Sequence, residues 1–91
     1  MAQLIHTFTT LVKDADGRVY LAEVWGSQRD DGLWEGWLQF IAAEDGAVLR
    51  TNRETTQTHV GALTYWATGL EPVYLEGALR RASLVLPTVQ R

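Results

Sequence analysis

The first half of the chain alternates short apolar runs with turn signals. Four runs are rich in β-branched and aromatic residues, which favour strands: 4–12, 19–25, 33–42 and 47–51. Three segments of the Asp-Gly type separate these runs: 14–17, 30–32 and 45–46. Asp bonds to the local backbone and Gly accepts positive φ, so each segment is typical of a tight turn. The pattern predicts about four antiparallel strands joined as a meander.

The second half of the chain has a helical period instead. Apolar residues recur there at spacings of three and four: Val60, Leu63, Ala67 and Leu70. This period predicts one buried helical face, with Thr55 or Thr56 as the N-cap and a left-handed Gly69 at the end. Pro72 then predicts the first turn of a second helix, because its missing N–H costs nothing there.

These elements together predict an α+β fold, in which two C-terminal helices pack on one face of the antiparallel sheet. The 91 residues fit a single domain spanning 1–91, with 84–91 as a loose tail that contains a proline and lacks periodicity. The expected core contains these residues: Leu21 or Tyr20, Val24, Trp34, Leu38, Phe40, Val60, Leu63, Ala67, Leu75, Ala78 and Leu79.

Alternation along the second and third predicted strands separates two faces of the sheet. One face is apolar: Tyr20, Ala22, Val24, Trp34, Gly36, Leu38 and Phe40. The other face mixes Trp25 and Trp37 with Glu23 and Glu35, a composition typical of a partner interface. The two carboxylates are then expected at the rim or paired with an arginine such as Arg29. The alternatives are that a helix or the tail covers both tryptophans, or that each is exposed singly.

A polar run before the first predicted helix is a candidate anion site. Arg50 and Arg53 precede Thr55 and Thr56, and a helix N-terminus attracts anions through its free N–H groups and its dipole. A phosphate or carboxylate ligand would suit this arrangement. The alternative is structural, with the threonines capping the helix and Arg53 paired with a nearby acid.

His59 is a candidate general base in the same region. Glu54 lies five residues earlier in the sequence and could orient and polarise the imidazole. No serine or cysteine motif accompanies the pair, so a surface histidine is the alternative reading.

Composition narrows the remaining function classes. A net charge of −3 argues against non-specific nucleic-acid binding, although Arg50, Arg53, Arg80 and Arg81 could form a local basic patch. The chain has no cysteine and only two histidines, so we expect no disulfide, metal site or cofactor. It shows no signal peptide and no apolar run near ~20 residues, which predicts a cytoplasmic protein with no membrane partner.

The sequences RETTQ and YWATGLEPVYLEGALRRA, within residues 53–82, resemble a family of small uncharacterised bacterial proteins. The resemblance covers the second half of the chain. It implies a free-standing bacterial domain and no particular activity, cofactor or catalytic residue. The function predicted from the residues is a non-enzymatic binding or assembly module that forms a homodimer. The alternative is an anionic-ligand-binding or catalytic domain that uses Arg53, Glu54 and His59.

Overall fold

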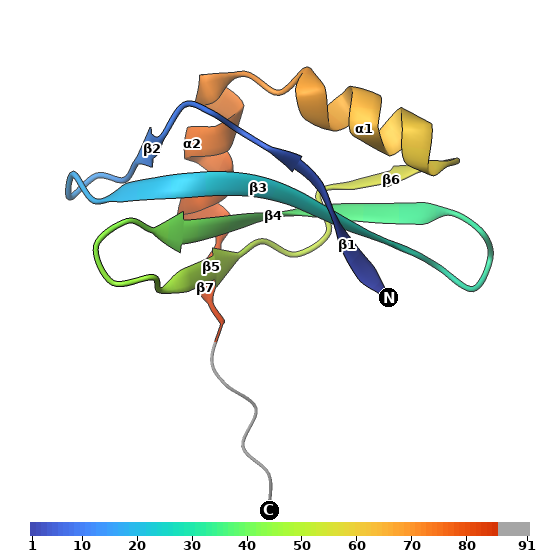
Figure 1. Ribbon diagram of the computed structural model, residues 1–91, viewed down its shortest axis with the longest axis horizontal. Coiled ribbons are helices and arrows are strands. Elements are labelled where there is room, and N and C mark those ends of the chain that lie inside the picture. Colours follow the sequence, from blue (N-terminus) through green and yellow to red (C-terminus); the bar gives the residue numbers. More distant parts are fainter. Residues whose placement is uncertain (86–91) are drawn as a thin grey trace, which may run out of the picture.

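The computed structural model describes residues 1–85, which form an antiparallel sheet with two helices on one face (Figure 1). The elements in chain order are β1 (Ala2–Thr7), β2 (Val12–Lys13), β3 (Val19–Gln28), β4 (Trp34–Ala42), β5 (Val48–Arg50), β6 (Thr55–Gln57), α1 (Val60–Thr68), α2 (Pro72–Arg81) and β7 (Ser83–Leu84). The α+β class, the antiparallel pairing and the two C-terminal helices confirm the prediction.

Within residues 1–85 the sheet has seven strands, more than the four or so that the sequence predicts. Its order is β1-β3-β4-β5-β7, while β2 also pairs with β3 and β6 also pairs with β4. The predicted strand 4–12 is divided into β1 and β2, the predicted strand 47–51 corresponds to β5, and β6 and β7 are short strands that the sequence pattern does not predict. Pieces of two or three residues carry too few alternating positions to show a strand period.

The predicted turns are confirmed by their glycines. Gly17, Gly32 and Gly46 have φ of 81°, 89° and 74°, a region that side-chain-bearing residues rarely enter. Aspartates brace the turns, as when Asp14 Oδ1 accepts hydrogen bonds of 2.9 Å from the N–H groups of Asp16 and Arg18. The turns fix the register of the meander, and with it the side chains that share each face.

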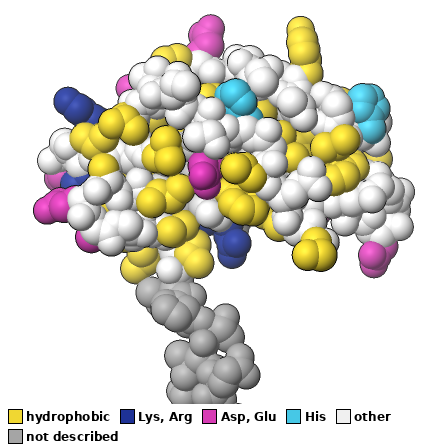
Figure 2. All heavy atoms as spheres, in the orientation of Figure 1, with side chains coloured by type: hydrophobic (Ala, Val, Ile, Leu, Met, Phe, Trp, Pro, Cys, Tyr) yellow, Lys and Arg dark blue, Asp and Glu magenta, His cyan; other side chains and the backbone are white. Residues whose placement is uncertain are grey.

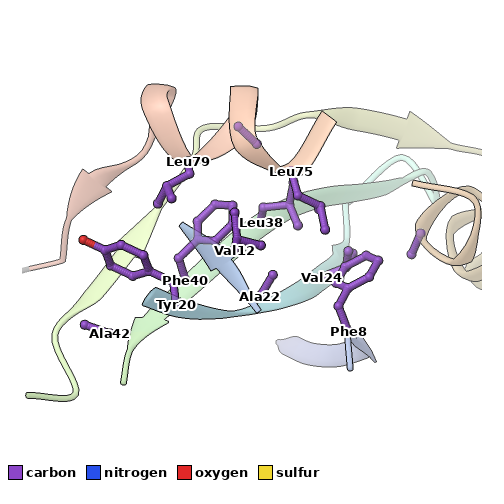
Figure 3. Close-up of a cluster of buried hydrophobic side chains, with 12 residues drawn as sticks. Phe8, Val12, Tyr20, Ala22, Val24, Leu38, Phe40, Ala42, Leu75 and Leu79 are labelled. Atoms are coloured by element: carbon purple, nitrogen blue, oxygen red, sulfur yellow. The ribbon is translucent and has the colours of Figure 1, made fainter. Parts of the chain in front are cut away.

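The hydrophobic core lies between the sheet and the helices. Leu75 and Leu79 of α2 point onto side chains from the strands, Phe40 and Leu38 among them (Figure 3). Most of the predicted core is buried, and of the alternatives Leu21 and Tyr20 it is Tyr20 that lies in the core. Two predictions are wrong: Trp34 is half-buried and Val60 is 38% exposed. Val60 is the first residue of α1 and so lies at the rim of the packed surface.

Helix α1 is seated on a pair of glycines. Gly26 of β3 lies opposite Gly36 of β4, and the side chain of Leu63, fully buried, fills the space above them. A Cβ at Gly26 would lie 2.5 Å from Leu63 Cδ2, and one at Gly36 would lie 2.6 Å from Leu63 Cδ1. The paired glycines therefore allow the helix to approach the sheet closely.

The first two residues of the predicted loose tail, Leu84 and Val85, are attached to the sheet. Leu84 ends β7 and pairs with Leu49 of β5, and the Val85 N–H donates to the Val48 carbonyl at 2.8 Å. The rest of the predicted tail, 86–91, lies outside the described residues.

Candidate functional site

The most distinctive surface is the face of the sheet opposite the helices, which we call the open face. It is formed by the alternate residues Leu21, Glu23, Trp25 and Ser27 of β3, Glu35, Trp37, Gln39 and Ile41 of β4, and Val48 and Arg50 of β5. Burial alternates strictly along β3 from Val19 to Ser27, with the helix-facing set buried and the open-face set half-buried. The predicted division of the two faces is confirmed.

Strand register arranges the apolar side chains of the open face into two rows. The aromatic row consists of Leu4, Trp25 and Trp37, which lie opposite one another across β1, β3 and β4. Leu4 at its edge is 47% exposed. The two tryptophans are half-buried because they are neighbours in one row, and no helix of the described chain lies over them.

A second apolar row and a polar row complete the pattern. The aliphatic row consists of Leu21, Ile41 and Val48. Between the two apolar rows lies the polar row, Glu23, Gln39 and Arg50. Figure 2 shows hydrophobic side chains gathered over β3 and β4 around one acidic side chain.

The polar contacts of the open face are few. Trp25 Nε1 donates to Glu23 Oε1 at 2.9 Å, and Arg29 Nε lies 3.8 Å from Glu35 Oε2, so the expected pairing of Glu35 with Arg29 is found. Trp37 Nε1 is buried without a hydrogen-bond partner among the described residues. A buried donor without an acceptor costs free energy, so this face leaves one polar group unsatisfied.

A hollow of about 280 Å³ adjoins Trp37 at one end of the open face. Its lining residues are Ser27, Glu35, Trp37, Arg50, Thr51 and Arg53. Residues from both predicted sites meet here: Arg50 and Arg53 from the anion site, and Glu35 and Trp37 from the interface. Neither of these two arginines forms an ion pair within residues 1–85. The sequence could not show this meeting, because it depends on the path of the chain after β5.

Glu54 lies in a different cluster, which holds α2 against the sheet. Its Oε1 accepts hydrogen bonds of 2.5 Å from the Tyr74 hydroxyl and from Arg81 Nη2. Burial, followed by the hydrogen bond to Glu54, raises the pKa of Tyr74 to about 12. We call Glu54, Tyr74 and Arg81 the α2 clasp.

The N-terminus of α1 differs from its predicted form. Thr55 and Thr56 belong to strand β6, and the helix begins later, with His59 as its N-cap. His59 Nδ1 accepts a 3.1 Å hydrogen bond from the Ala62 N–H, so this nitrogen caps the helix N-terminus. β-branched threonines favour a strand, which explains why the pair extends the sheet. At the other end, Gly69 is right-handed, with φ of −90°.

Within residues 1–85, no three His, Cys, Asp or Glu side chains are close enough to hold a metal ion. No helix in the same part of the chain is long and apolar enough to cross a membrane. Comparisons with protein-family models, with curated proteins and with solved structures gave no match. The resemblance of 53–82 to a bacterial family therefore stays a prediction.

Proposed function

We propose that this protein is an assembly module that forms a homodimer through its open face. The observation that carries the proposal is the arrangement of two apolar rows, one of them containing Trp25 and Trp37, on a sheet face that no helix of residues 1–85 covers. A sheet that is apolar on both faces is stable when a second layer covers each face. The helices supply one layer, and a second copy of the chain supplies the other.

The composition of the open face supports a protein partner. Interfaces are enriched in tryptophan and arginine and keep their charged groups toward the rim. Here Trp25 and Trp37 lie inside the face, and Glu35 lies beside Arg29 toward the end of its strand. Glu23 and Arg50 lie between the two apolar rows instead, so an interface on this face has to pair their opposite charges. A two-fold dimer is the simplest closed assembly, because the same surface then serves both subunits.

The positions of the other candidate residues favour assembly over the catalytic alternative. Of the three residues expected to act together, Arg53 lines the hollow, Glu54 lies in the α2 clasp and His59 caps α1. A general base needs an oriented partner within hydrogen-bond reach, and the clasp already engages Glu54 through Tyr74 and Arg81.

Light scattering at several concentrations tests the proposal. We expect the wild type to approach twice the chain mass of 10.2 kDa as its concentration rises through about 1–100 μM. Trp37→Glu places a charge in the aromatic row, so this variant should keep the mass of one chain. Tyr65→Glu is the matched control, because Tyr65 is 83% exposed on the opposite, helical side, and it should dimerise like the wild type.

Circular dichroism of Trp37→Glu shows whether the variant is folded. A wild type that keeps the mass of one chain up to about 100 μM would contradict the proposal, because a micromolar dissociation constant corresponds to only about 8 kcal/mol. A folded Trp37→Glu variant that dimerises as well as Tyr65→Glu would contradict the placement of the interface on the open face.

A further inference from the structure

We infer that the two copies stack their open faces about a two-fold axis running along β4, so that Glu23 of each chain meets Arg50 of the other. This inference rests on the proposed dimer and specifies its geometry. Its basis is the polar row, in which Glu23 lies opposite Gln39 and Gln39 lies opposite Arg50. Opposite charges thus occupy the two ends of one row, with an uncharged amide between them.

The spacing of the row makes the open face self-complementary. Neighbouring strands lie about 4.8 Å apart, so the backbone positions of Glu23 and Arg50 are separated by about 10 Å, one on each side of β4. Neither residue forms an ion pair within the described chain. A rotation about β4 exchanges the two ends, which places the Glu23 carboxylate over the Arg50 guanidinium of the second copy at both ends.

A two-fold axis across the strands gives a poorer arrangement. If that axis passed through the polar row, Glu23 would face Glu23 of the second copy and Arg50 would face Arg50. If it passed between the polar row and an apolar row, the charged row would be pressed onto that apolar row, where unpaired charges are costly. If it passed through the aromatic row, Glu23 would face the uncharged Ser27 of the second copy. Like charges placed opposite each other disfavour an interface strongly. Charge complementarity therefore selects the axis along β4.

The apolar rows are consistent with the same axis. The aliphatic row then packs on itself, with Ile41 near the axis and Leu21 facing Val48 of the second copy. Trp37 also lies near the axis and meets Trp37 of the second copy, whereas Trp25 faces the hollow beside Trp37 of that copy. Gln39 faces its own copy, where two side-chain amides can bond to each other. Glu35 also lies on β4, but it lies near the rim with Arg29 at 3.8 Å and Arg53 in the adjoining hollow. Aligned sheets of this kind pack at about −30°.

A charge-swap experiment by light scattering tests this geometry. Glu23→Arg alone creates two Arg–Arg contacts per dimer, and Arg50→Glu alone creates two Glu–Glu contacts, so each should weaken homodimerisation at least about tenfold. An equimolar mixture of the two variants restores two opposite-charge contacts and should form a dimer. The chain that carries both substitutions should likewise dimerise. Glu76→Arg, on an exposed position of α2, makes the same change in net charge as Glu23→Arg and should have no effect.

The outcomes separate this inference from the proposed function. A monomeric wild type would overturn both. A dimeric wild type whose single variants dimerise with unchanged affinity, or whose mixed variants remain monomeric, would overturn the axis along β4 and leave the dimer standing. If one single variant does not fold by circular dichroism, the doubly substituted chain still decides, because only the inferred geometry predicts that it recovers dimerisation relative to the folded single variant.

Discussion

The two faces of β3 and β4 share one backbone but differ in how deeply their side chains are buried and in whether they include charged residues. On the helix-facing side Ala22, Val24, Leu38 and Phe40 are fully buried, and Gly26 and Gly36 leave room for a single leucine. On the open face large apolar side chains are half-buried and are arranged in rows around Glu23 and Arg50.

The difference indicates what each face packs against. The helix-facing side packs closely against the helices of the same chain, so a small change in side-chain volume there should change the free energy of unfolding strongly. The open face combines apolar area with opposite charges at the two ends of its polar row, which suits association that depends on concentration and on charge. Substitutions on the two faces should accordingly affect different measurements.

The largest effect is expected where α1 meets the sheet. Leu63→Ala should lower the free energy of unfolding by about 3 kcal/mol, because it empties a fully buried site between Gly26 and Gly36. Leu21→Ala on the open face should cost the single chain clearly less, because Leu21 is only half-buried. Urea unfolding at low protein concentration measures both. Equal losses would show that the two faces are not packed differently.

A smaller effect is expected from filling the glycine pair. Gly36→Ala should cost about 1–3 kcal/mol, since its Cβ would lie 2.6 Å from Leu63 Cδ1. The double variant Gly36→Ala/Leu63→Ala should lose less unfolding free energy than the two single variants lose together, because the shorter side chain at residue 63 makes room for the methyl group. Gly77→Ala in α2 is the control and should be stabilising by up to about 1 kcal/mol. Strict additivity would show that Leu63 does not limit the size of residue 36.

The smallest effect concerns the α2 clasp and appears only at high pH. The folded chain raises the pKa of Tyr74 from 10.0 to about 12, so between these values the unfolded chain loses this proton while the folded chain keeps it. Stability is therefore retained below pH 10 and falls as the pH rises toward 12. Tyr74→Phe should make this fall shallower in urea titrations at increasing pH. An unchanged slope would contradict the role of Tyr74, whereas a remaining slope is expected because the pKa of Tyr20 is also raised.

The sequence predicts the long central strands and their two faces well, because alternation over nine or ten residues leaves little ambiguity. It also predicts the turns, since Gly17, Gly32 and Gly46 each follow an aspartate-rich signal. It does not predict that 55–57 forms a strand, because pairing of this short piece with β4 is a tertiary contact. For the same reason it pairs Glu54 with His59, whereas in the fold Glu54 bonds to Tyr74 and Arg81 and His59 caps α1.

Paramagnetic relaxation tests most directly whether a second copy covers the open face. A soluble paramagnetic probe broadens the methyl signals it can reach, so Leu21 and Ile41 should broaden less in the wild type than in Trp37→Glu at the same concentration. Trp37 is four residues from Ile41, about 13 Å along the strand, so the substitution does not itself uncover these methyl groups. Val73, which is 71% exposed on α2, should broaden equally in both proteins. Equal broadening of Leu21 and Ile41 in the two proteins would contradict a dimer formed through the open face.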